Sequence, residues 1–123
     1  MTAYYDNQPS ILEAMGDGSY RYRWAITKAD FVGEEDETIE QWQCQEVTVW
    51  AALTPNKITR AVFDELWGEG VEQKMLNEYN AANLGIYDAS VAEAKVRAYT
   101  EFLRERERIK AMVDADCQSL NII

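Results

Sequence analysis

Hydrophobic and polar residues alternate from Ser19 to Thr27, and this period of two predicts a β-strand. Its larger apolar side chains share one face, formed by Tyr20, Tyr22, Trp24 and Ile26. Arg21 and Arg23 fall on the opposite face. Rings beside arginines are typical of a surface that stacks nucleic-acid bases. Residues 1–53 hold ten acidic and three basic side chains, however, so we favour a face that packs in the core.

A second extended segment is predicted over residues 39–52, so the two strands would form an antiparallel hairpin. Residues 30–38 between them are acidic and too many for a tight turn, and we expect a mobile, charged tip. The second strand changes phase: one apolar set is Trp42 and Cys44, and the other is Val47, Val49 and Ala51. A bulge at Gln45 and Glu46 would restore one buried face, and we favour it. Alternatively both faces are partly covered, with Thr48 and Trp50 packing on a second surface.

Apolar spacing of three and four residues predicts three helices in the second half of the chain. Thr54 and Pro55 are typical of a helix start, and this first helix would end at Gly68. The second helix would cover residues 71–84 and stop at Gly85. The third would begin at the Ser90 to Glu93 capping box and continue to about Cys117. Its 28 residues would span about 42 Å, more than a compact chain of this size covers, so it either breaks or contacts another molecule.

The chain therefore predicts one α+β domain over residues 1–123, in which an N-terminal antiparallel β-hairpin packs on three C-terminal α-helices, the last one long. Residues 1–53 would be the hairpin part and 54–123 the helical part. We expect a single helical turn at residues 10–15, and leave open whether Tyr4 and Tyr5 add a third strand. The longest apolar run has five residues, and the start of the chain shows no basic region followed by an apolar stretch, so we expect a soluble, unsecreted protein without membrane contact.

The chain has no histidine and a net charge of -10, which changes the expected chemistry. Histidine is the usual general base near neutral pH and the commonest metal ligand, so we expect no enzyme, no cofactor and no metal. The acidic balance opposes direct binding of nucleic acid or anionic membranes. Cys44 and Cys117 lack a C-x-x-C spacing and are expected to be reduced, buried thiols.

The acidic loop consists of Glu34, Glu35, Asp36 and Glu37. It could bind a divalent cation or imitate a row of phosphates, but it lacks the spaced ligands and glycine of a calcium loop. A solvated tip that discourages edge pairing is the simpler interpretation. Alternating charges at residues 101–110 are typical of an exposed helix face, or of the flanks of a coiled-coil seam.

Four segments together resemble a family of small uncharacterised proteins encoded by phages and prophages of gut bacteria. They are GDGSYRYRWAIT, LTPNKITRAVFDELW, EQKMLNEYNAANLG and RAYTEFLRERERIKAMVDADC, and they are spread along nearly the whole chain. The resemblance implies a virion-associated or assembly-accessory role, and with it a location in the cytoplasm of a bacterial host or in the virion. It transfers no functional residues, because none of these strings is a catalytic motif.

The leading hypothesis is a non-catalytic phage or prophage accessory or virion-assembly protein that acts through protein contact and self-association, as a homo-oligomer. The expected contact residues are Phe102, Ile109, Val113, Leu120, Trp50 and Trp67. The alternative is an acidic inhibitor, or nucleic-acid mimic, that occupies a basic groove of a host protein. A hydrolase that depends on carboxylates or a metal ion comes third.

Overall fold

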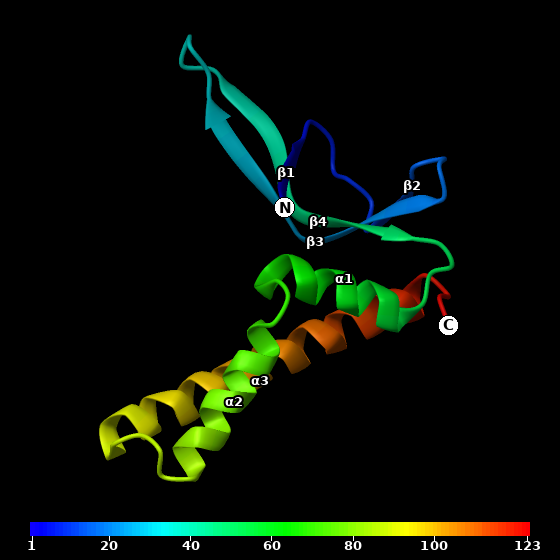
Figure 1. Cartoon of the computed structure of the whole chain (residues 1–123). Coiled ribbons are helices and arrows are strands. Elements are labelled where there is room, and N and C mark those ends of the chain that lie inside the picture. Colours follow the sequence, from blue (N-terminus) through cyan, green and yellow to red (C-terminus); the bar gives the residue numbers. More distant parts are fainter. The chain divides into compact units, whose positions relative to one another are not determined.

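The computed structural model describes all residues, Met1–Ile123, and contains a four-stranded antiparallel sheet and three helices (Figure 1). This confirms the predicted α+β class and the long third helix. The chain divides into two compact units, Met1–Ala61 with Ile122–Ile123, and Val62–Asn121. The boundary falls inside the first helix and not at the end of the predicted hairpin part.

The sheet has the strand order β1-β4-β3-β2, with every pair antiparallel. Its strands are β1 (Thr2–Tyr5), β2 (Leu12–Ala14), β3 (Ser19–Val32) and β4 (Thr38–Trp50). The predicted hairpin is the central pair, and Tyr4 and Tyr5 belong to the third strand that the sequence left open. The helical turn expected at residues 10–15 is wrong. Residues 12–14 form the strand β2 instead, because pairing with β3 satisfies backbone groups at the edge of that strand.

Strands β3 and β4 continue well beyond the two short edge strands (Figure 1). Their outer ends form a two-stranded ribbon with a turn at residues 33–37, and we call residues 29–41 the β-arm. In the turn, the Gly33 amide donates to the Glu37 carbonyl at 2.7 Å. The expected loop at residues 30–38 was therefore too long. Phe31 and Ile39 pair across the ribbon, which extends both strands into the acidic segment.

A β-bulge interrupts β3, not β4. It lies between Trp24 and Thr27, where Ala25 has a φ of 53°. The bulge expected at Gln45 and Glu46 is wrong, since β4 stays in regular register there. Each face of β4 instead carries buried residues, which the alternative anticipated. Thr48 and Trp50 nevertheless remain exposed, so they do not form the second packed surface.

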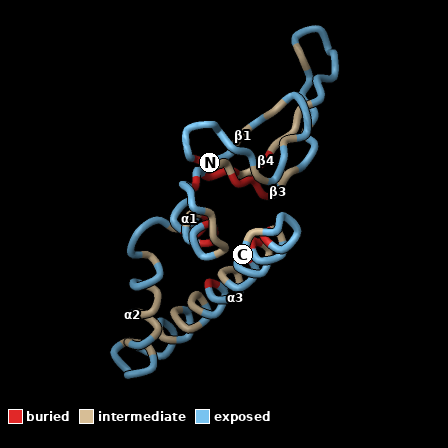
Figure 2. Tube along the Cα trace, turned by 90° about the vertical axis from the view of Figure 1, so that its right-hand side faces the viewer, coloured by how far each residue is buried: buried red, intermediate tan, exposed pale blue.

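The apolar core of the first unit lies along β3 and β4 outside the β-arm. Figure 2 shows buried positions along the middle of these strands. Its buried apolar residues are Tyr22, Trp24, Cys44, Val47, Val49 and Ile58. The Tyr22 and Trp24 rings stack with centroids 5.9 Å apart. This confirms the aromatic face as core for these two rings. Burying one large apolar side chain contributes about 1.5–3 kcal/mol, so these residues hold the centre of the sheet.

The three helices are α1 (Pro55–Trp67), α2 (Val71–Asn83) and α3 (Ala89–Ser119). Thr54 caps α1, since its hydroxyl accepts from the Lys57 amide at 3.1 Å, as predicted. The Ser90 capping box is wrong. Asp88 is the N-cap of α3, and its carboxylate accepts from the Val91 amide at 3.1 Å. The 31 residues of α3 form one unbroken helix of about 46 Å.

Helices α2 and α3 form an antiparallel hairpin within the second unit (Figure 1). The rings of Tyr79 and Tyr99 lie 4.8 Å apart between the helices, and Lys95 pairs with Glu78 at 3.0 Å. Arg106 Nε lies 3.1 Å from a Glu72 oxygen without hydrogen-bond geometry. The hairpin is therefore joined along its length by rings and ion pairs.

Candidate functional site

A buried ion pair lies in the sheet, formed by two charged residues that the sequence analysis did not select. Arg23 is 2% exposed and Glu46 is 4% exposed. Arg23 Nε donates to Glu46 Oε2 at 3.0 Å, because the two residues are cross-strand partners in the register of β3 and β4. A buried charge is stable only when it is paired and hydrogen-bonded. This pair therefore marks a built polar site inside the sheet.

Each of the four strands contributes one side chain to the network around Arg23. Arg23 Nη2 donates to Glu13 Oε1 of β2 at 2.6 Å and to the Tyr5 hydroxyl of β1 at 3.1 Å. The Tyr5 hydroxyl in turn donates to Glu46 Oε2 at 2.5 Å. The guanidinium also lies over the Tyr5 ring, 4.7 Å from its centroid. One arginine thus joins all four strands.

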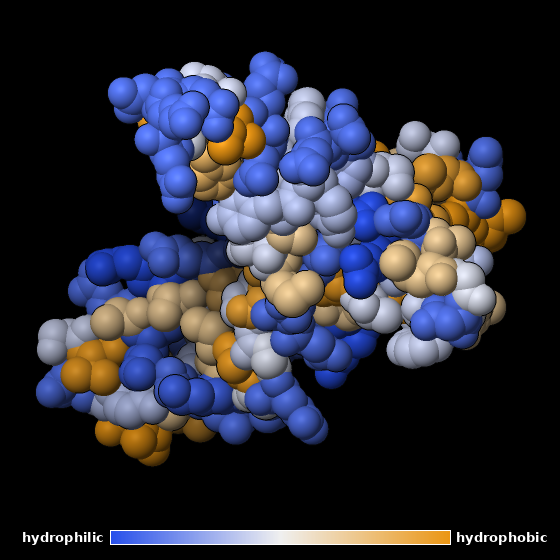
Figure 3. Space-filling view, turned by 90° about the horizontal axis from the view of Figure 1, so that it is seen from above, coloured by the Kyte–Doolittle hydropathy of each residue, from blue (hydrophilic) through white to orange (hydrophobic).

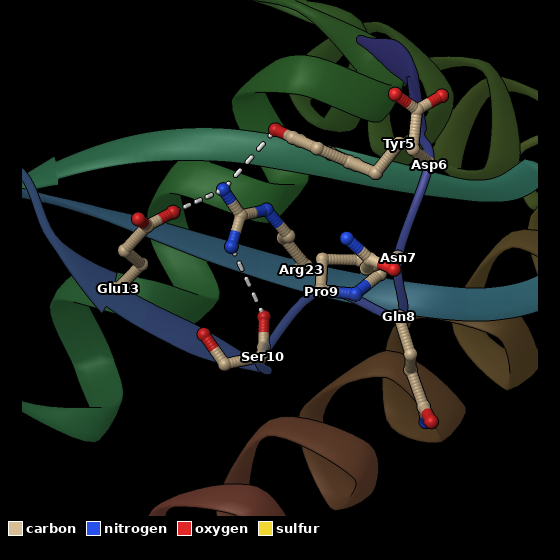
Figure 4. A pocket seen from close by; sticks show the side chains of 8 residues that line it. All are labelled: Tyr5, Asp6, Asn7, Gln8, Pro9, Ser10, Glu13 and Arg23. Carbon is tan, nitrogen blue, oxygen red and sulfur yellow. Dashed lines mark hydrogen bonds and ion pairs between the residues drawn. The ribbon is translucent and has the colours of Figure 1, made fainter.

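A cavity of about 330 Å³ opens beside this network (Figure 4). It is lined by Tyr5, Asp6, Asn7, Gln8, Pro9, Ser10, Glu13 and Arg23, most of which belong to the connection between β1 and β2. Arg23 Nη1 donates to the Ser10 carbonyl at 3.2 Å, which ties this connection to the sheet. Figure 4 shows the guanidinium bonded to residues of the cavity wall. The wall is polar, but its one arginine is engaged by the protein itself.

Hydrogen bonds and opposite charges in the network favour the charged forms of Glu46 and Arg23. Burial raises the pKa of the Glu46 carboxyl, but hydrogen bonds from Tyr5 and Arg23 outweigh it and hold the pKa below its ordinary value. Burial lowers the pKa of Arg23, and its bonds to Glu13, Glu46 and Tyr5 raise it by more. Two carboxylates therefore neutralise the arginine. The site has no spare cation with which to hold an anionic ligand.

The pKa of Glu46 predicts a pH dependence of stability. Because the folded-state value is lowered, Glu46 stabilises the fold above its unfolded pKa, and this contribution is lost as pH falls through the folded pKa. We expect the free energy of unfolding in urea to decline between about pH 5 and pH 3, and to decline less steeply in Glu46→Gln. The exposed change Glu101→Gln should keep the wild-type profile. Parallel profiles for wild type and Glu46→Gln would contradict this assignment.

The expected contact residues occupy very different environments. Three of them, Phe102, Ile109 and Val113, are buried, so a partner has no access to them at the surface of this structure. Trp67 is half-buried, and its ring meets the Phe102 ring edge-on with the two centroids 4.9 Å apart. Leu120 and Trp50 are exposed. Three of the six residues therefore pack in the interior and are not available at the surface.

The acidic loop lies at the tip of the β-arm, where Glu34, Glu35, Asp36 and Glu37 are all exposed. Across the structure, no group of three or more His, Cys, Asp or Glu side chains is arranged to hold a metal ion. Cys44 and Cys117 are free and buried, as predicted. Burial raises the pKa of both thiols, which keeps them protonated.

The sequence contained one signal for the Arg23 network. Glu46 follows Trp42 and Cys44 in one strand phase, and a carboxylate beside these apolar side chains requires a partner if that phase is buried. Its partner could not be identified, because Arg23 and Arg21 both lie on the polar face of the first strand. The contribution of Tyr5 depends on pairing between β1 and β4, which are distant in sequence, and that of Glu13 on a three-residue strand without an alternating pattern.

Exposed apolar side chains gather in two places outside this site. One is the β-arm, with Phe31, Val32 and Ile39. The other is the turn between α2 and α3, with Leu84 and Ile86. Figure 3 shows hydrophobic patches at the surface, set among hydrophilic side chains. Exposed apolar patches commonly mark interaction sites.

None of the three helices has a stretch long and apolar enough to cross a lipid bilayer. Comparison of the chain with protein-family models, curated proteins and solved structures finds no match.

Proposed function

We propose that this protein is a non-catalytic accessory protein, of the kind its resemblance to phage and prophage proteins implies, and that its β-arm binds a basic partner protein. The observation that carries the proposal is an exposed apolar surface on a ribbon whose charged residues are all acidic. The Arg23 network supports the non-catalytic part, because Glu13 and Glu46 are engaged in holding the sheet.

The apolar surface of the β-arm is built by cross-strand neighbours. Phe31 and Ile39 are direct partners in the register, and each is 42% exposed. The Tyr4 ring of β1 meets Phe31 edge-on, with centroids 5.8 Å apart, and is itself 52% exposed. Aromatic rings are enriched at protein interfaces because they offer a large contact area at low entropic cost. This face can therefore supply the apolar centre of a contact.

The charge of the β-arm selects the partner. Residues 29–41 contain six acidic side chains and no basic one. Lys28, just outside, pairs with Glu40 at 2.9 Å and offsets one of them. Opposite charge on a partner would steer its approach and fix its orientation. A basic surface fits this ribbon, whereas another acidic molecule would be repelled.

The backbone of the β-arm offers a third element of recognition. No third strand pairs with either side of the ribbon over residues 29–32 and 38–41. Such edges are templates for an incoming extended segment, which adds main-chain hydrogen bonds to the side-chain contacts. The acidic side chains discourage edge-to-edge pairing of two copies and favour a basic segment. We therefore propose that the partner presents an extended, basic stretch.

Two synthetic octapeptides test this proposal, one alternating Lys and Val and the other alternating Glu and Val. We expect the Lys–Val peptide to bind the full chain and the Glu–Val peptide not to bind, in isothermal titration calorimetry. The triple variant Glu34→Gln, Glu35→Gln and Glu37→Gln should weaken binding by about tenfold, because it removes the charge at the arm. Added NaCl should weaken binding by wild type, since it screens the attraction.

The matched control removes three exposed carboxylates elsewhere, as Glu69→Gln, Glu101→Gln and Asp114→Asn. Both triple variants have the same net charge, so only the place of the change differs. We expect the control to stay within about twofold of wild type. Equal weakening by the two variants, or no binding of the Lys–Val peptide, would refute the β-arm as the contact surface.

A further inference from the structure

The longest segment without charge in the second unit covers the end of α2 and the turn that leads to α3. Tyr79 to Tyr87, nine residues that we call the helical tip, contain no charged side chain, although 28% of the chain is charged. Leu84 is 78% exposed and Ile86 is 71% exposed, among the highest values of any large apolar residue. The helical tip therefore joins strong apolar exposure to a local absence of charge.

Main-chain hydrogen bonds order the backbone that carries these two side chains. The Ile86 amide donates to the Ala81 carbonyl at 3.1 Å and the Gly85 amide to the Ala82 carbonyl at 3.4 Å. These two bonds form a Schellman motif, which requires the left-handed φ of 75° at Gly85. Ile86 occupies the position that usually packs back on the helix, yet it stays exposed. The apolar pair is thus displayed by a well-bonded turn.

The two acidic residues that flank the helical tip are both engaged by other groups of the protein. Asp88 immediately follows and is engaged as the N-cap of α3. Glu78 immediately precedes and pairs with Lys95 on the other helix. The nearest negative charges in the sequence therefore already have partners. A surface that covers Leu84 and Ile86 would therefore have to order chiefly these two side chains and not the backbone of the turn.

We propose that the helical tip binds the helical tip of a second copy of this chain. Each copy carries a net charge of -10, so two copies repel wherever acidic surfaces meet. A tip-to-tip contact brings together the uncharged segments, at which this repulsion is least. A two-fold arrangement would place Leu84 and Ile86 of one copy against the same pair of the other. This contact is separate from the β-arm and does not depend on its partner.

The contact is small, and this sets its expected strength. Two well-exposed apolar residues per copy cover less area than a standard protein interface. We expect a dissociation constant between about 10 µM and 1 mM. Salt should tighten the dimer, because it screens repulsion between the acidic copies while the apolar contact remains. This is the opposite of the salt effect expected for the β-arm and a basic peptide.

Sedimentation equilibrium of the full chain tests the proposal, from about 10 µM to about 1 mM protein at low and high NaCl. We expect the average mass to rise from the 14.1 kDa of one chain toward twice that value. The double variant Leu84→Ser and Ile86→Ser should raise the dissociation constant at least about tenfold. Both residues are exposed, so the variant keeps its fold, and circular dichroism verifies this.

Val32→Ser on the β-arm is the matched control, because Val32 is 76% exposed and also apolar. It should leave the dissociation constant within about twofold of wild type. A mass of one chain at every concentration would overturn the proposal. A dimer that the double variant leaves intact would place the contact on another surface, and a dimer that salt dissociates would indicate an electrostatic contact. Neither result would bear on peptide binding by the β-arm.

Discussion

Arg23→Met is expected to lower the free energy of unfolding by about 3–5 kcal/mol, the largest loss that we predict for a single substitution of a charged residue. The change leaves the Glu46 carboxylate, which is 4% exposed, without its hydrogen-bonded buried cation and with only the partly exposed Arg21 at 3.8 Å. It also removes the bonds to Tyr5 and Glu13 that join the edge strands. Urea unfolding followed by tryptophan fluorescence would measure the loss.

Arg21→Met is the matched control, because Arg21 lies 3.8 Å from the same carboxylate but its side chain is 40% exposed. We expect it to cost less than about 1 kcal/mol. The double variant Arg23→Met and Glu46→Met should recover most of the stability lost in Arg23→Met, since it leaves no unpaired buried charge. Equal losses for Arg21→Met and Arg23→Met would show that burial of the ion pair does not control stability here.

Ile109→Ala is expected to lower the free energy of unfolding by about 2–5 kcal/mol, because it removes apolar contacts and leaves a cavity. Ile109 is 0% exposed, so nearly all of its side chain packs inside the protein. Chemical denaturation would measure this loss, and light scattering would measure the mass of the native state. We expect no change in mass, since a buried residue does not form a surface contact.

Leu103→Ala is the control on the same helix, because Leu103 is 38% exposed. We expect Leu103→Ala to lower the free energy of unfolding by less than about 1 kcal/mol, because much of the Leu103 side chain is already in contact with water. The apolar spacing of α3 predicts that Ile109 and Phe102 lie at a contact between copies. A fall in native mass for Ile109→Ala, without a loss of stability, would support that earlier interpretation and contradict the interior role.

The helices were predicted well because their signals are local. Thr54 and Pro55 define the start of α1, and the glycine at position 85 closes α2, within a few residues in each case. The start of α3 was misplaced by one or two residues, since both Asp88 and Ser90 can cap a helix. Apolar spacing alone described the rest of α3, which carries no proline or glycine to interrupt it.

The sheet was predicted in part, because its remaining features leave no clear local pattern in the sequence. The central hairpin follows from alternation in β3, but the three residues of β2 carry no strand pattern of their own. The bulge lies at Ala25, a residue whose type does not favour a positive φ. The Arg23 network was missed for the same reason, since its four members come from four strands.

The β1–β2 connection in the cavity wall is attached to the sheet through its backbone and not through its side chains. The bond that ties the β1–β2 connection to Arg23 uses the main-chain oxygen of Ser10, which any amino acid supplies. Asp6, Asn7 and Gln8 line the hollow while the structural bonds are made by residues on strands. This stretch can consequently be diversified with little damage to the framework beneath it. The small sheet would then serve as a scaffold on which new recognition loops are selected.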